Sequence, residues 1–145
     1  GETVADVDAV DLGECARECW SRVDTADATL RVDGSTTVQA DRDRLSHVLE
    51  NLFRNSVEHG GRDVTVRVDT LNGGDGLFVE DDGVGIPADR IDRVRETGFT
   101  SSQDGTGFGL AIVDRIVDAH GWELRITEGE AGGARFEICG VDRAG

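Results

Sequence analysis

Two asparagines and a histidine lie on one side of the segment with the clearest helical pattern. Asn51, Asn55 and His59 recur at four-residue steps, so a helix places them in one polar stripe. Asparagine is a middling helix former, and its amide offers two donors and an oxygen that can bind a hard cation such as Mg²⁺. Taken alone, the stripe is explained better by a solvated helix face with an incidental pair of amides.

A second candidate is the turn Asp81-Asp82-Gly83-Val84-Gly85-Ile86, which directly follows a predicted strand. A carboxylate at a strand end can accept a hydrogen bond from an amino group such as that of adenine. Glycine has no side chain, so a flat ring can approach this backbone closely. Turns rich in Asp and Gly are common, so this motif by itself is only moderately specific.

The third candidate is Gly105-Thr106-Gly107-Phe108-Gly109-Leu110, which begins a predicted helix. Free N–H groups and the dipole at a helix start favour an anionic phosphate. The Gly-x-Gly-x-Gly spacing differs from that of a dinucleotide-binding loop, and the sequence contains no lysine, which a P-loop requires. A glycine-rich loop of this kind is weak evidence on its own.

The helix that carries the asparagine stripe is predicted from its apolar residues. These recur at three- and four-residue steps and are Leu45, Val48, Leu49, Leu52 and Phe53. Asp41 or Asp43 is suited to cap the start of this helix, and Gly60-Gly61 to end it.

The other elements are predicted from alternation, caps and turn residues. They are a short strand or extended arm over 4–12, a helix over 12–22, strands over 29–32 and 37–40 around the turn at 33–35, a hairpin of 64–68 with 77–79, a short helix over 87–94, a helix over 108–119 and a hairpin of 124–127 with 134–139. Strands interspersed with three main helices predict an α/β two-layer sandwich, with the sheet covered on one face.

Composition limits the class of protein. With 145 residues, 37% of them apolar, the chain suffices for one domain with one core over residues 1–145. Thirty acidic residues against 15 basic ones give a net charge of −15, which argues against nucleic acid as a partner. Such a charge repels itself unless ions screen it. The acidic, lysine-free composition resembles that of proteins from salt-loving archaea.

The chain also shows no sign of membrane insertion. It has no signal peptide and no apolar run of the ~18 residues that cross a membrane, so we expect a cytoplasmic location. Its three cysteines lack the spacing of a zinc site, and Cys15 and Cys19 share a helical face with apolar residues. We therefore expect buried, reduced thiols. Because the chain begins with Gly and lacks Met, we interpret it as a fragment of a longer protein.

In their order along the chain, the helix with paired asparagines, the Asp-x-Gly-x-Gly turn and the Gly-x-Gly-x-Gly-Leu helix start resemble the Bergerat nucleotide-binding fold. Histidine kinases, anti-sigma-factor kinases, gyrase-type topoisomerases, Hsp90-type chaperones and mismatch-repair ATPases share this fold. The resemblance implies ATP and Mg²⁺ as cofactors. It also implies a mixed, largely antiparallel sheet covered on one face by three main helices.

One position separates the branches of this family. The ATPase branches carry a glutamate, the general base for water, four residues before the Mg²⁺-binding asparagine. Here that position is Asn51, and an amide cannot take a proton. The segments 50–59 and 107–113 are similar to the N box and to the end of the G2 box of sensor histidine kinases. The resemblance therefore implies the catalytic domain of a sensor histidine kinase.

This resemblance implies a role for each matching residue. Asn55 would hold Mg²⁺, Asn51 would act catalytically near the phosphates, His59 would pack beside adenine, and Asp81 would accept a hydrogen bond from its amino group. The other implied ATP-binding residues lie in the Asp-Gly turn, the lid over 98–105 and the glycine-rich helix start: Gly83, Gly85, Ile86, Phe99, Thr100, Ser101, Gly105, Thr106, Gly107, Phe108, Gly109 and Leu110.

Three residues depart from the kinase pattern. Arg95 replaces an aromatic residue, Glu58 stands where many kinases carry a basic one, and Ala134 replaces a threonine near adenine. Mg²⁺, backbone amides and Arg54 or Arg95 would then have to offset the phosphate charge. These departures leave open a degenerate module that binds ATP without transferring it.

The phosphate acceptor and the partners are expected outside these residues. None of His47, His59 and His120 lies in a phosphoacceptor motif, and we interpret His47 as a surface or pocket-edge residue and His120 as a helix-end residue. The implied partners are a dimerisation domain that carries the phosphorylated histidine and a downstream response regulator. A serine kinase of the anti-sigma-factor type is the alternative within the same fold.

Overall fold

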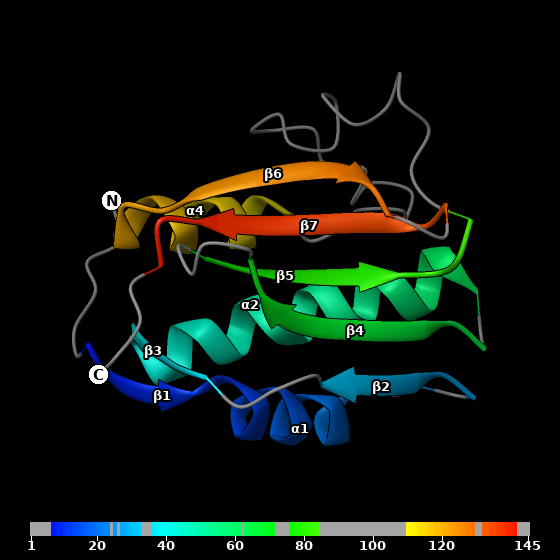
Figure 1. Cartoon of the computed structure of the whole chain (residues 1–145), viewed down its shortest axis with the longest axis horizontal. Coiled ribbons are helices and arrows are strands. Elements are labelled where there is room, and N and C mark those ends of the chain that lie inside the picture. Colours follow the sequence, from blue (N-terminus) through cyan, green and yellow to red (C-terminus); the bar gives the residue numbers. More distant parts are fainter. Residues whose placement is uncertain are drawn as a thin grey trace.

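The computed structural model of the chain describes residues 7–23, 25, 27–32, 36–61, 63–71, 76–84, 110–129 and 132–141. Across these ranges it contains a five-stranded sheet and a separate two-stranded ladder (Figure 1). No helix within the ranges is long and apolar enough to cross a membrane. The short helix expected over 87–94 and the lid over 98–105 lie outside the described residues.

The five-stranded sheet is mixed and largely antiparallel, as predicted. Its strands, in spatial order, are β2 (Thr29–Val32), β4 (Thr65–Thr70), β5 (Gly76–Asp81), β7 (Ala134–Cys139) and β6 (Glu123–Glu128). β2 runs parallel to β4, and the other neighbours are antiparallel. Both predicted hairpins form, with Val68 opposite Val79 and Ile126 opposite Phe136.

The strands on either side of the turn at 33–35 form at the predicted residues but do not pair with each other. β2 lies at the edge of the main sheet, where Thr29 pairs with Thr65. β3 (Thr37–Ala40) pairs instead with β1 (Asp8–Asp11), and Val38, which is buried, faces Val10. Alternation of apolar and polar residues predicts that a segment is a strand. Which other strand it pairs with depends on tertiary packing, because the pairing must bury its apolar face.

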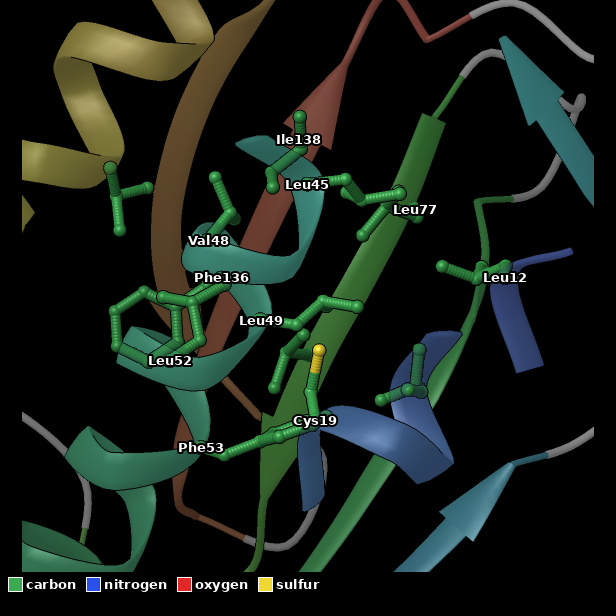
Figure 2. Packing of buried hydrophobic residues seen from close by; sticks show 14 of the residues in the cluster. Leu12, Cys19, Leu45, Val48, Leu49, Leu52, Phe53, Leu77, Phe136 and Ile138 are labelled. Carbon is green, nitrogen blue, oxygen red and sulfur yellow. The ribbon is translucent and has the colours of Figure 1, made fainter. Parts of the chain in front are cut away.

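Three helices among the described residues cover one face of this sheet: α1 (Leu12–Arg22), α2 (Arg42–Asn55) and α4 (Leu110–His120). The middle helix, α2, contacts both others and lies over β5. All five of its predicted apolar residues are fully buried. Figure 2 shows Leu45 beside Leu77 and Ile138 of the sheet, whereas Phe53 extends towards Cys19 of α1. All of these residues belong to one buried apolar cluster, which is the core.

Specific residues determine where α2 begins and where its helical run ends. Asp41 caps the start, because its carboxylate accepts from the N–H groups of Asp43 (3.1 Å) and Arg44 (3.3 Å). At the other end, the expected α-helix widens after Asn55 into a π-helical turn, η1 (Ser56–Gly60). Gly61 then ends the run with a φ of 129°, a conformation that favours glycine. The wider turn rotates the residues after Asn55 away from their α-helical positions.

The predicted environment of the cysteines is confirmed for the first two. Cys15 and Cys19 of α1 are buried and reduced, whereas Cys139 is partly exposed. Beside them, Trp20 meets Phe53 edge-on, with 5.2 Å between ring centroids. The contact between α1 and α2 therefore has an apolar centre.

Candidate functional site

The polar end of β5 carries a buried carboxylate. Asp81, the last residue of the strand, is 3% exposed. Its Oδ1 accepts hydrogen bonds from the N–H groups of Gly83 (2.9 Å) and Ala134 (3.2 Å). Burial, the largest influence, raises the pKa of Asp81, while the hydrogen bonds from these two donors lower it. The carboxylate is thus held in one orientation by two separate turns.

Close backbone packing surrounds this carboxylate and requires glycine at two positions. A Cβ at Gly83 would lie 2.2 Å from the carbonyl oxygen of Gly60, and one at Gly133 would lie 2.4 Å from Asp81 Oδ1. The end of η1, the turn after β5 and the start of β7 therefore meet at Asp81. Gly83 was predicted from the sequence, whereas Gly133 was missed. The only signal at Gly133 was the pair Gly132-Gly133 in front of the last strand.

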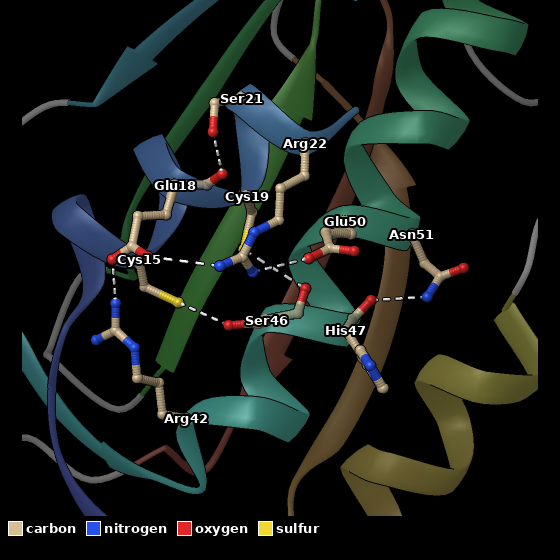
Figure 3. Close-up of polar contacts among 10 residues, drawn as sticks. All are labelled: Cys15, Glu18, Cys19, Ser21, Arg22, Arg42, Ser46, His47, Glu50 and Asn51. Atoms are coloured by element: carbon tan, nitrogen blue, oxygen red, sulfur yellow. Dashed lines mark hydrogen bonds and ion pairs between the residues drawn. The ribbon is translucent and has the colours of Figure 1, made fainter. Parts of the chain in front are cut away.

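The asparagine stripe is divided by the fold. Asn55, at the end of α2, is 4% exposed, so the interpretation of a solvated face is wrong for this residue. Asn51, one turn earlier, is partly exposed, and its amide donates to the His47 carbonyl at 2.7 Å (Figure 3). The His47 side chain is exposed. The two asparagines of the stripe therefore differ in burial.

The structure describes only part of the predicted ATP-binding set. The backbones of His59 in η1 and Leu110 at the start of α4 are described. The predicted residues outside the described ranges are Gly85, Ile86, Phe99, Thr100, Ser101, Gly105, Thr106, Gly107, Phe108 and Gly109. Of the departures, Glu58 is exposed and Ala134 is buried, whereas Arg95 also lies outside these ranges.

Ser56 is a buried residue that sequence reasoning missed. It follows Asn55 directly, at the junction of α2 and η1, and is 2% exposed. Among the described residues, its Oγ is the one buried side-chain oxygen or nitrogen without a hydrogen-bond partner. A serine after an asparagine has no distinctive spacing, so the sequence offered no signal for it.

The amide oxygen of Asn55 is a type of ligand that Mg²⁺ accepts. No group of three or more His, Cys, Asp or Glu side chains with metal-binding geometry occurs among the described residues. Mg²⁺ commonly takes one or two protein oxygens and completes its shell with water and phosphate oxygens. A single buried amide oxygen is consistent with that mode.

His120 connects the end of α4 to the start of α2. Its Nε2 accepts from the Asp41 N–H at 3.2 Å, so Nδ1 carries the proton and donates to the Ile116 carbonyl at 2.9 Å. The ring also stacks on Trp122, with 3.9 Å between centroids. The predicted helix-end location is confirmed, and the contact helps to position the helix that carries Asn55.

A family model described as "Histidine kinase-, DNA gyrase B-, and HSP90-like ATPase" matches residues 40–143. The chain belongs to this ATPase family. The sensor histidine kinase ZraS of Escherichia coli O157:H7 is 39% identical over 103 residues, which are 70% of this chain and 22% of ZraS. The chain thus spans about a fifth of the length of this curated relative.

Solved structures of histidine kinases share the fold of this member of the ATPase family. The mycobacterial sensor histidine kinase MprB superposes with a TM-score of 0.76 at 26% identity, covering 94% of this chain and 100% of that one. Full-length ShkA in complex with AMPPNP gives 0.73 at 27% identity, over 99% of this chain and 32% of ShkA. The chain is a histidine kinase-type ATP-binding catalytic domain, and the two alternatives are not favoured.

Proposed function

We propose that the chain is a single catalytic domain, over residues 1–145, that transfers the γ-phosphate of ATP to a histidine on a dimerisation domain of the same kinase. The observation that carries this is the buried Asp81 carboxylate, oriented by the N–H groups of Gly83 and Ala134 where glycines keep the backbone bare. The buried amide of Asn55 supplies a second ligand group at the end of α2.

Each residue has a role in this proposal. Asp81 accepts from the adenine amino group, and Asn55 holds Mg²⁺ through its amide oxygen. Bound Mg²⁺ neutralises charge on the phosphates. Asn51 lies near the phosphates and cannot act as a base on water, which leaves the phosphoryl group for the acceptor histidine. The protein contributes positioning and charge stabilisation and forms no covalent bond.

The remaining groups are proposed from the resemblance. The segment from Gly105 to Leu110, where α4 begins, binds the phosphates through backbone N–H groups, and the segment with Phe99, Thr100 and Ser101 forms the lid. Gly83, Gly85, Ile86 and His59 line the base pocket. The whole kinase passes the phosphate to a response regulator and acts in the cytoplasm. The net charge of −15 supports adaptation to concentrated salt.

Asp81→Asn tests the base contact. We expect ATP affinity to fall roughly 10- to 100-fold, because a hydrogen bond to a charged group contributes about 1.5–3 kcal/mol. Asp82→Asn is the matched control, because it removes the same charge from an exposed neighbour whose carboxylate accepts from the Thr65 N–H at 2.8 Å. Calorimetric titration with ATP and Mg²⁺ measures both variants. Equal affinities for the two variants would contradict the assigned role of Asp81.

Phosphotransfer is tested by adding a separately expressed dimerisation domain and labelled ATP. The expected product is an acid-labile, alkali-stable phosphohistidine on the added domain. An acid-stable phosphoserine on a small partner protein would instead support the serine kinase. Binding of ATP without transfer to any supplied domain would support the degenerate module.

A further inference from the structure

We propose that His120 is a positioning residue for the phosphate end of the nucleotide, although it lies at the far end of both helices that lead to the phosphates. Its Nε2 accepts a hydrogen bond from the Asp41 N–H at 3.2 Å, which joins the end of α4 to the start of α2. This bond fixes how α4 is aligned along α2, and so where Asn55 lies relative to the start of α4. The role rests on the proposed function, which assigns the phosphates and Mg²⁺ to those two helix ends.

The ring of His120 is held in place by its own helix and the turn that follows. Gly121 ends α4 with a φ of 77°, and the Trp122 N–H donates to the Val117 carbonyl at 2.9 Å. This is the Schellman arrangement, in which a left-handed glycine follows the helix. It brings Trp122 against the ring, with 3.9 Å between centroids, while Nδ1 donates to the Ile116 carbonyl at 2.9 Å. The position of Nε2 is therefore fixed before it meets α2.

Asp41 connects the same hydrogen bond to the whole start of α2. Its carboxylate accepts from the N–H groups of Asp43 and Arg44, and its carbonyl accepts from the Leu45 N–H at 2.8 Å. The residue is 7% exposed, so its backbone is enclosed by neighbouring atoms. A shift of the Asp41 backbone would carry the first turn with it. The bond to His120 thus acts on α2 as a unit.

The two helices lead from this contact to the proposed site. α2 continues for 14 residues to Asn55, about 20 Å at 1.5 Å per residue, and Figure 1 shows it extending along the sheet. α4 leads back over 11 residues to Leu110, which the proposed phosphate-binding segment joins. The two helices contact each other, and their buried apolar residues share one core cluster. Apolar packing is non-directional, so a directional hydrogen bond at one end is what fixes the offset between Asn55 and Leu110.

The test separates the two contacts of the ring. His120→Phe keeps an aromatic ring beside Trp122 but removes the acceptor, whereas His120→Gln loses the stacking and keeps an oxygen that can accept from the Asp41 N–H. Binding of Mg²⁺-ATP, and of adenosine, which has no phosphates, is titrated on the whole chain and on both variants. We expect His120→Phe to weaken Mg²⁺-ATP roughly two- to tenfold and to leave adenosine unchanged, because the coupling cannot exceed the free energy of one hydrogen bond. His120→Gln should restore most of the Mg²⁺-ATP affinity.

Stability separates positioning from packing. His120→Gln should melt at a lower temperature than the wild type, because the stacking on Trp122 is lost, and should still bind Mg²⁺-ATP. The matched control is Val117→Ala on the same helix, where the valine is 1% exposed. It should also lower the melting temperature, because truncating a buried valine leaves a cavity. The affinities of this control for Mg²⁺-ATP and adenosine should equal those of the wild type.

Three results would overturn the role of His120. They are an unchanged Mg²⁺-ATP affinity in His120→Phe, an equal loss for Mg²⁺-ATP and adenosine in that variant, and a loss in Val117→Ala as large as that in His120→Phe. In each case the wild-type chain still binds Mg²⁺-ATP, so the proposed function stands. If the wild-type chain binds no Mg²⁺-ATP, the proposed function fails and the role of His120 fails with it.

Discussion

The end of β5 and the contact between α1 and α2 both bury polar or ionisable atoms, but they do so in different ways. At the end of β5, the buried Asp81 carboxylate accepts from two backbone N–H groups, and the buried Oγ of Ser56 has no hydrogen-bond partner. Between the helices, Cys19 Sγ donates to the Ser46 carbonyl and Cys15 Sγ lies beside the Ser46 hydroxyl, both at 3.5 Å (Figure 3). These sulfur atoms are engaged within the protein.

This difference separates the proposed nucleotide-binding region at the end of β5 from the region between α1 and α2, which stabilises the fold. Burial without full pairing opposes folding and is retained where a ligand completes the pairing. Burial with local partners and apolar neighbours stabilises the fold and needs no ligand. Substitutions in the first region should therefore alter nucleotide affinity more than stability, and substitutions in the second should do the reverse.

The largest effect is expected from Phe53→Ala in the stabilising region. Phe53 is fully buried and packs edge-on against Trp20, so its truncation should lower the free energy of unfolding by about 3–5 kcal/mol. Denaturant unfolding measures this loss. ATP affinity, measured at low temperature where the variant is folded, should stay within about threefold of the wild type. Phe53→Leu serves as a milder variant. A loss of ATP affinity without a loss of stability would contradict the distinction between the α1–α2 contact and the end of β5.

An intermediate effect is expected from pH at Asp81. Because burial raises its pKa, this group contributes stability that is fully present below its unfolded pKa and is lost as pH rises through its folded pKa. Asp81→Asn should therefore gain stability relative to the wild type when the pH is raised from about 4 to about 7. Unfolding of both proteins across this range measures the gain. A difference independent of pH would show that ionised Asp81 costs the fold nothing.

The smallest effect is expected from Arg22→Gln at the rim of the helix contact. Arg22 and Glu50 form an ion pair at 3.3 Å, but the arginine side chain is 56% exposed. Exposed pairs contribute about 0–1 kcal/mol, and about 1 M salt screens them. Thermal unfolding at low and high salt should show a small loss only at low salt. A large, salt-independent loss would place Arg22 among the packing residues.

Much of the fold was predictable because its elements are encoded locally. The apolar steps of α2 and the alternation in β4 each bury one face, so hydrophobic periodicity alone located these two elements, whereas every residue of β5 is buried. The location of Asp81 at the end of a strand was predicted in the same way. The division between Asn51 and Asn55 was not, since equal spacing along one helix does not reveal which turn the neighbouring strands and turns cover.

The sequence by itself determined the positions of the helices and strands and the kind of ligand its motifs suit, because periodicity, caps and glycine spacing act over a few residues. Only the tertiary structure decided that β2 joins the main sheet while β3 pairs with β1, and that Ser56, Gly133 and Asp81 meet at one point. These contacts join residues far apart in the chain. They are settled by which arrangement buries the most apolar surface and leaves the fewest buried polar groups unpaired.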